Sequence, residues 1–264
     1  MGNKILILYF VCLFFTNRLQ SGPENFCGIQ NKSTFSGERL HYQVFYSLAG
    51  IYVNAGEAIF SNQLDTFQQK PVYHVSGIGR THKNYEWIYK VNDVYESFID
   101  TSTMLPLKFK RNVRESGTRI YNHVLLNHAK HTAVSTNGVF KIPNCLQDVL
   151  SSIYYARNLD FSHAKIGDLF PFQIFLDDEV FPVHIRYLGK QQIKTKFGTF
   201  HTIKFKPKLI QGTLFKGGEQ MTVYVTDDDN KIPVLIETPI LVGTIKVELD
   251  KATTGKHPFN GKFN

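Results

Sequence analysis

Residues 40–47 read LHYQVFYS, and the pattern of this stretch recurs through most of the chain. Every second residue is apolar or aromatic, and the residues between them are mostly polar: Leu40, Tyr42, Val44 and Tyr46 alternate with His41, Gln43, Phe45 and Ser47. A period of two is the period of a β-strand whose two faces meet different surroundings. The stretch therefore predicts a strand.

The same alternation recurs at residues 86–91, 201–206 and 221–225. The 22 Phe and 13 Tyr residues suit the pleated surface of a sheet. Turn sequences, such as Asn137-Gly138 and the acidic run 227–230, separate the alternating stretches. We expect roughly a dozen to fifteen strands in an all-β fold with one large curved antiparallel sheet, either closed or half-closed as an unclosed β-barrel.

One segment departs from this period. After Pro143 in the sequence, apolar residues recur at helical spacing, at Leu146, Val149, Leu150, Ile153 and Tyr154. Asn144 and Gln147 have the spacing of a capping box. The sequence predicts an amphipathic helix near 145–157 with its apolar side on the sheet.

This helix divides the strands into residues 38–142 and 168–250, which permits two subdomains or one continuous sheet. No Pro/Ser-rich linker separates the halves, so we favour a single β domain over residues 37–250. Residues 23–36 would be an N-terminal extension, and residues 251–264 a flexible polar tail.

Residues 1–22 have the organisation of a secretory signal peptide. Lys4 precedes an apolar run from Ile5 to Thr16, and polar residues follow. This run is shorter than the roughly 20 apolar residues that a membrane-spanning helix needs. We expect export to the periplasm or cell surface. The cleavage site is not evident, so an uncleaved anchor and a buried first element stay open as alternatives.

Cysteine usage agrees with an oxidising compartment. Cys27 lacks the small preceding residues of a lipoprotein signal, so no lipid anchor is expected. Cys27 and Cys145 permit one disulfide, although the sequence leaves open whether they pair. Neither has a CxxC partner or a histidine at ligand spacing, so no metal site is predicted.

The formal net charge is +8, but the basic residues are spread along the chain. The densest cluster is interrupted by Phe109 and Glu115, and consists of Lys108, Lys110, Arg111 and Arg114. A nucleic-acid partner is not predicted, because such proteins usually carry a tighter basic face with aromatic platforms. We favour a solvated strand face as the place of these basic residues. Binding of an anionic glycan or lipid headgroup is compatible with this interpretation.

Catalytic and cofactor motifs are lacking. There is no G-x-S-x-G, and Gly77-Ile78-Gly79 stops short of a dinucleotide fingerprint. Asp93, Glu96 and Asp100 lie near one strand, and a glycoside hydrolase site would have to be assembled from them. We expect a protein without catalytic residues, metal or cofactor.

Aromatic residues supply the candidate ligand site, namely Tyr42, Tyr46, Trp87, Tyr89 and Phe98. On the concave face of a curved sheet they would hold an acyl chain or stack on a sugar. An ordinary β core needs the same residue types, so both interpretations stay open.

A set of short motifs follows in order along the chain. It comprises GERLHY at 37–42, VNAGEA at 53–58, VNDVYESFID at 91–100, LP at 105–106, FKR at 109–111, QDVLSSIYYAR at 147–157, FGTF at 197–200, TDD at 226–228, IPV at 232–234 and VGTI at 242–245. Over about residues 37–250 the set resembles the bacterial domain-of-unknown-function family numbered 3108.

The resemblance implies an exported all-β envelope protein of a Gram-negative bacterium, without an established activity. It further implies a sheet similar to the unclosed barrel of the periplasmic lipoprotein carriers, which hold acyl chains on a concave apolar face under a helical lid. The helix near 145–157 would be that lid. This likeness is one of fold, and fold alone does not fix function.

Charged residues inside these motifs lie beside apolar residues that should be buried. A buried charge must be paired, so we expect Asp148 or Asp93 to bond with Arg157 or Arg111. Glu38 completes this structural charge network.

Our leading hypothesis is a non-enzymatic β protein that binds a lipid, lipoprotein or other apolar ligand in the concave face of its sheet. A glycan- or protein-binding structural module is the second hypothesis. A hydrolase acting on envelope polymers is the third.

Overall fold

The computed structural model describes residues 29–49, 51–211, 217–240, 242–253, 257–259 and 261–263. The first half contains the strands β1 (Arg39–Leu48), β2 (Ile51–Phe67), β3 (Lys70–Thr81), β4 (Asn92–Asp100), β5 (Pro106–Glu115), β6 (Thr118–Asn127), β7 (Thr132–Ser135) and β8 (Gly138–Lys141), with the short 3-10 helix η1 (Lys83–Tyr85). Helix α1 (Val149–Ala156) follows. The second half contains β9 (Leu169–Leu176), β10 (Glu179–Lys194), β11 (Gly198–Pro207), β12 (Thr222–Thr226), β13 (Pro233–Pro239), β14 (Thr244–Thr253) and β15 (Gly261–Phe263).

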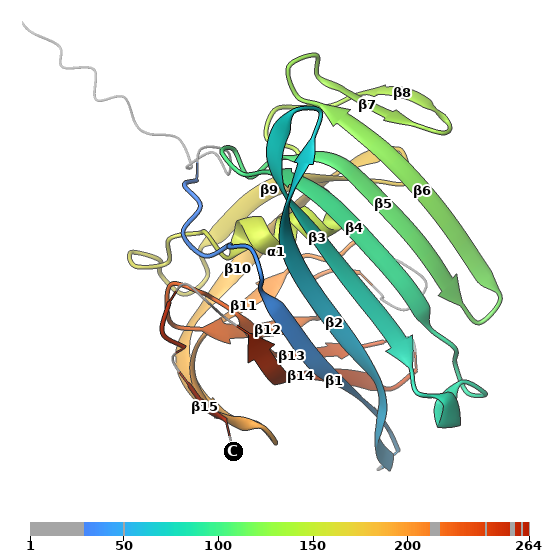
Figure 1. The fold of residues 1–264 in the computed structure, drawn as a ribbon. Helices are drawn as coiled ribbons and strands as arrows, with labels where there is room; N and C mark the ends of the chain where they lie inside the picture. Colours follow the sequence, from blue (N-terminus) through green and yellow to red (C-terminus); the bar gives the residue numbers. More distant parts are fainter. Residues whose placement is uncertain are drawn as a thin grey trace, which may run out of the picture.

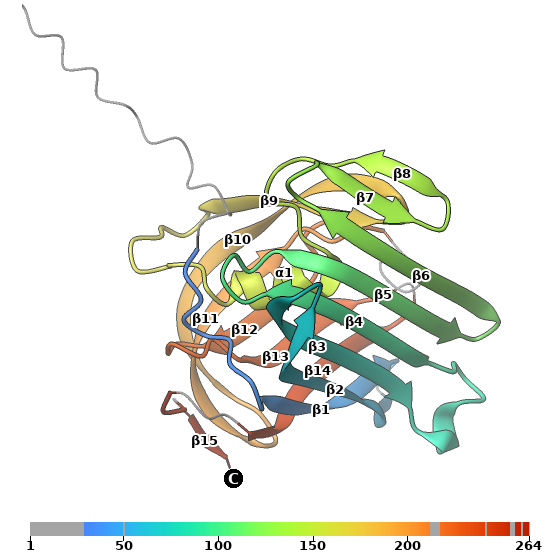
Figure 2. The same cartoon turned by 45° about the horizontal axis from the view of Figure 1, so that its top comes forward.

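The 15 strands of the described residues belong to one sheet, in the order β8-β7-β6-β5-β4-β3-β2-β1-β14-β13-β12-β11-β10-β9, with β15 beside β11. The pairing of β1 with β14 joins the two halves of the chain. The sheet curves around α1 without closing into a barrel (Figures 1 and 2). The all-β fold with one central helix is confirmed.

Cross-strand pairing produces rows of side chains on opposite faces of the sheet. One row is apolar across six strands, and we call it the apolar row: Val44, Val247, Ile236, Val223, Phe205 and Tyr187. The neighbouring row on the other face carries Gln43, Glu248, Leu235, Tyr224 and Lys204. Four members of the apolar row, Tyr187, Phe205, Val223 and Ile236, share a core cluster with α1, so the face of this row is the concave one.

Helix α1 begins later than the sequence pattern predicts. Its N-cap is Asp148, whose carboxylate accepts hydrogen bonds from the backbone amides of Leu150 and Ser151, both at 2.8 Å. The predicted cap by Asn144 and Gln147 is wrong. The backbone of Gln147 instead bonds to β9, donating to Gln173 and accepting from Phe175, both at 2.9 Å.

One side of α1 is buried against the concave face. Leu150, Tyr154 and Tyr155 are each at most 2% exposed, and the helix packs mainly on β3, β4 and β9. Gly77 in β3 makes room for it, because a Cβ there would lie 3.6 Å from Leu150 Cδ1 and 3.1 Å from Phe60 Cε1. Burial of this apolar side stabilises a helix that is too short to persist alone.

The predicted signal peptide, residues 1–22, lies outside the described residues. In the part of the chain that the structure describes, no helix has the length and apolar character needed to cross a bilayer.

Candidate functional site

The concave face is only partly covered. The main contacts of α1 are with β3 and β4 in the first half of the sheet and with β9 at the edge of the second half, whereas β1, β13 and β14 are not among them. The apolar row is buried on β10, β11 and β12, where Tyr187, Phe205 and Val223 are 6–8% exposed. On β1, β13 and β14 the same row is half-buried, at Val44, Ile236 and Val247. The concave face therefore keeps an accessible apolar strip over these three strands.

The five aromatic residues proposed as a ligand site do not lie on one face. Tyr42 is 2% exposed and packs edge-on against Phe60 at 5.8 Å between ring centroids. Tyr42 pairs with Ala58 on β2, which pairs with Gly79 on β3, and Gly79 pairs with Asp93 on β4, so Tyr42 and Asp93 lie on the same face of the sheet. Phe98, five residues beyond Asp93 on the same strand, therefore faces the opposite side.

The other aromatics have separate surroundings. Phe98 stacks on His74 at 4.2 Å, with Lys108 Nζ 4.5 Å from its ring centroid. The Tyr46 hydroxyl donates to the Val242 carbonyl at 3.3 Å, and that of Tyr89 to Glu115 at 3.1 Å. Trp87 is 83% exposed in the β3–β4 loop. The structure does not bring these side chains together.

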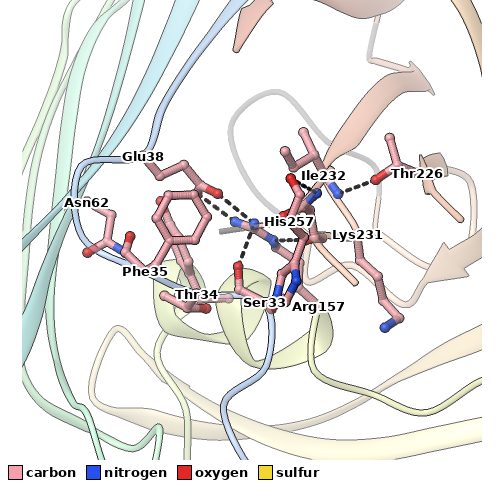
Figure 3. A network of polar contacts seen from close by, with 12 residues as sticks. Ser33, Thr34, Phe35, Glu38, Asn62, Arg157, Thr226, Lys231, Ile232 and His257 are labelled. Atoms are coloured by element: carbon pink, nitrogen blue, oxygen red, sulfur yellow. Dashed lines mark hydrogen bonds and ion pairs between the residues drawn. The ribbon is translucent and has the colours of Figure 1, made fainter. Parts of the chain in front are cut away.

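A buried ion pair connects distant parts of the chain (Figure 3). Arg157, at the C-cap of α1, donates to both carboxylate oxygens of Glu38, at 2.7 and 2.6 Å. It also donates to the carbonyls of Asn230 at 2.9 Å and Ser33 at 3.2 Å. Glu38 is 1% exposed and Arg157 3%, so the pair is structural.

The predicted partners within the charge network are wrong. Asp148 caps α1 and accepts from the Ser97 hydroxyl at 2.6 Å, while burial raises its pKa to about 6. Arg111 donates to Asn122 and Asp177. Arg157 caps the opposite end of the helix from Asp148, nine residues and about 13 Å away along the axis. Asp148 therefore satisfies helix amides, and Arg157 pairs with Glu38.

The carboxylates suggested for hydrolysis do not converge. Asp93 is on the concave-face row, whereas Glu96 faces the other side and bonds to His74 at 2.9 Å. Asp100 is used locally, accepting from the backbone and hydroxyl of Ser102 at 2.9 and 2.5 Å.

Sequence reasoning missed a partner of Asp93. This carboxyl accepts from the Arg114 amide at 2.9 Å and hydrogen-bonds to the side chain of Glu115. Burial, together with the nearby Glu115 charge, raises the pKa of Asp93 to about 6. The two residues are 22 positions apart, and their meeting follows from the pairing of Val91 with Glu115 at the end of the strands.

Two polar hollows adjoin the β3–β4 loop. The first has a volume of about 400 Å³ and is lined by residues that include Glu57, Arg80, Lys83 and Glu86. The second has about 350 Å³ and is lined by residues that include Arg114, Glu115 and Arg119. Lys90 and Asn92 line both, so the hollows adjoin each other. The sequence did not indicate these hollows, because their charged residues are spread along the chain and are brought together only by the fold.

Cys145 is disulfide-bonded. The other two cysteines of the chain, Cys12 and Cys27, lie outside the described residues. Pairing of Cys145 with Cys27 stays a prediction.

The sequence model of the family described as "Protein of unknown function (DUF3108)" matches residues 41–250. The chain belongs to the DUF3108 family. The resemblance seen in the ordered motifs is thereby confirmed. No curated protein matches this DUF3108 chain.

One solved structure shares the fold of this DUF3108 protein at low identity, and two others match it with lower TM-scores. A β-barrel-like protein of family DUF1849 from Brucella abortus has a TM-score of 0.52 and 8% identity, covering 83% of this chain and 98% of its own. A candidate lipoprotein from Parabacteroides distasonis has a TM-score of 0.37 and 11% identity, covering 85% and 99%. A candidate exported protein with a YmcC-like fold from Bacteroides fragilis has a TM-score of 0.30 and 9% identity, and the match covers 86% of this chain and 100% of its own. The first likeness concerns the fold alone.

Proposed function

We propose that this DUF3108 protein is an exported, non-enzymatic binding protein of the bacterial cell envelope. Its ligand is an apolar group, such as an acyl chain of a lipid or lipoprotein, held against the concave face beyond α1. The observation that carries the proposal is the half-buried end of the apolar row, at Val44, Ile236 and Val247.

Burial of apolar surface supplies the binding energy. Each Å² removed from water contributes about 25 cal/mol, so a ligand across this strip gains from side chains that water now contacts. The strip continues into the buried half of the same row. A chain-like ligand would thus lie along the row, across the strands.

Export is supported by the N-terminal sequence pattern and by the disulfide at Cys145. Disulfides persist in oxidising compartments and are rare in the cytosol. The proteins from Parabacteroides and Bacteroides, described as a lipoprotein and as an exported protein, agree with this location.

The arrangement of carboxylates supports a role without catalysis. Glycosidases place two carboxyl groups about 5 to 9.5 Å apart, on either side of the scissile bond. Asp93 and Glu115 instead hydrogen-bond to each other, and Glu96 and Asp100 point elsewhere.

The test measures binding of a fluorescent C16 fatty acid to the full chain. Ile236→Gln places a polar amide in the apolar row and should weaken binding by about tenfold. Glu237→Gln is the matched control, because it puts the same side chain on the other face of β13 and should leave binding unchanged. Equal binding by both variants, or no binding by the wild type, would refute the proposal.

A further inference from the structure

The β3–β4 loop exposes the single Trp of the chain. Trp87 is 83% exposed, and Ile88 beside it is 51% exposed. The indole N–H donates to the Asn84 carbonyl at 3.0 Å, so its one polar group is satisfied within the loop. What faces outward is the apolar part of the ring. Tryptophan with this amphipathic character is typical of membrane–water interfaces.

A second hairpin adds apolar surface at the same end of the molecule. The tip of β1–β2 exposes Leu48 at 41%, Ile51 at 62% and Tyr52 at 46%. Both ribbon views place this tip and η1 at the same end (Figures 1 and 2). Scattered apolar residues need no explanation on a protein surface, but several gathered at one end do.

Basic residues lie directly beside this loop, in the two hollows. Arg114 stands opposite Arg119 in the β5–β6 pair, and both are exposed. Like charges placed directly opposite each other destabilise a sheet. Among the described residues, neither arginine forms an ion pair with a carboxylate. The two arginines therefore present positive charge that no ion pair neutralises.

The acids that line the hollows already have partners other than Arg114 and Arg119. Glu57 bonds to Arg80 and to His41, and Glu86 bonds to Lys90 at 2.7 Å. Glu115 accepts from Tyr89 and lies against Asp93. Arginines with open donors bind phosphate oxygens well, because the guanidinium offers paired N–H groups.

We propose that the β3–β4 loop and the two hollows beside it dock on the anionic headgroup surface of a lipid bilayer. Lipid phosphates would occupy the second hollow, at Arg114 and Arg119, and Trp87 and Ile88 would enter the headgroup layer. A bilayer is chosen over a soluble anion because the basic hollows and the apolar loop adjoin, and only a membrane interface satisfies both. The surface uses the outer face of the sheet, so it does not depend on the ligand of the concave face.

Trp87 provides its own probe. The full chain is titrated with vesicles of phosphatidylglycerol and phosphatidylcholine, and with vesicles of phosphatidylcholine alone. We expect a blue shift of tryptophan emission with the anionic vesicles, weakened by added salt, and quenching by brominated acyl chains. Since the chain has a single Trp, such a shift locates the contact at this loop.

Variants separate the hollows from other membrane-active parts of the chain. Arg114→Gln with Arg119→Gln should weaken vesicle binding by about tenfold or more, since each basic residue near an anionic surface adds to the attraction. Arg114→Lys with Arg119→Lys should retain most of it. Lys194→Gln with Lys208→Gln is the control. It changes the net charge by the same amount at two exposed sites, at the end of β10 and directly after β11 in the sequence, and should bind as the wild type. All variants carry the same N-terminal segment.

Three results would overturn the proposal. One is equal binding to charged and uncharged vesicles, and another is wild-type binding by the Arg114→Gln, Arg119→Gln variant. The third is a response of Trp87 to inorganic phosphate without any response to vesicles, which would indicate a soluble anion. Fatty-acid binding by the same variants tests the concave face separately, so the two proposals can fail independently.

Discussion

At the scale of single residues, the buried ion pair Glu38–Arg157 is the interaction on which the stability of the fold depends most. The two residues are 119 positions apart, and their side chains are 1% and 3% exposed. Taking charges out of water is costly, and here two hydrogen bonds and mutual attraction offset the cost. The pair fixes the end of α1 to the start of β1, and the further bonds of Arg157 reach Ser33 and Asn230. Loss of either charge leaves the other without compensation.

Glu38→Gln should therefore destabilise the fold by about 3 kcal/mol, because the Arg157 charge would stay buried without a counter-ion. Urea unfolding followed by circular dichroism measures this. Glu86→Gln is the control, since it removes only the exposed i,i+4 pair with Lys90 and should cost about 0.5 kcal/mol or less. Similar midpoints for the two variants would show that the buried pair is not needed.

Asp93 gives the stability a dependence on pH. Its pKa is raised to about 6 in the folded state, by burial and by Glu115, against about 3.9 in an unfolded chain. A raised carboxyl pKa means that the folded state holds the proton more tightly. The contribution is thus complete below about pH 4 and is lost as the pH rises through about 6.

Asp93→Asn should be more stable than the wild type by about 1–2 kcal/mol at pH 8, and nearly equal to it near pH 4. Asparagine can still accept from the Arg114 amide and can donate to Glu115. Urea midpoints measured across this pH range check the expectation. Glu179→Gln, an exposed change in β10, should leave the pH profile as it is. An unaltered profile for Asp93→Asn would contradict the assignment.

At the scale of elements, α1 depends on its cap and on the sheet beneath it. Its eight residues are fewer than an isolated helix needs. Asp148 satisfies two free amides at the start, and Leu150, Tyr154 and Tyr155 fill the core. The helix exists because the concave face accepts these side chains. Space at Gly77 is part of that fit.

Gly77→Val should destabilise by about 1–3 kcal/mol, because its side chain would press on Phe60 and Leu150. Gly79→Val is a matched control, two residues further on the same face of β3, where a Cβ meets nothing within 4 Å. Denaturant unfolding of both variants makes the comparison. If Gly79→Val were the more damaging, the packing of α1 on this part of the sheet would be wrong.

At the scale of the whole molecule, one curved sheet holds together both halves of the chain. The pairing of β1 with β14 links residues near its two ends, and the disulfide at Cys145 adds a covalent constraint. In this arrangement the apolar strip and the basic hollows lie on opposite faces of one sheet.

Peptide mapping without reduction should recover Cys145 joined to Cys27. Such a bond closes a loop of roughly 120 residues, and its reduction should lower stability by about 2–4 kcal/mol. Cys12→Ser should leave both the bond and the stability unchanged. Cys27→Ser should abolish the bond, and reduction should then have no further effect on the stability. A linkage of Cys145 to Cys12 or to a second chain would refute the pairing.

The sequence by itself determined most of the strands, the existence of the central helix and the family. These follow from the alternation of apolar and polar residues and from the order of short motifs, which are properties of neighbouring residues. A large antiparallel sheet follows too, from the many strands with turns between them, but only the tertiary structure decided that it stays open. The strand expected at residues 86–91 is wrong, because this segment belongs to the loop between β3 and β4.

Only the tertiary structure decided which side chains meet. The register of β1 on β2 shifts between Val44 and Phe45, so alternation alone cannot assign every aromatic to a face. Asp148 lies nearer to Arg157 in the sequence than Glu38 does, but the helix separates them and the fold brings Glu38 across. Arg114 and Arg119 become a basic pair only through the β5–β6 register. Periodicity is local, whereas partners are set by how distant strands pair and pack.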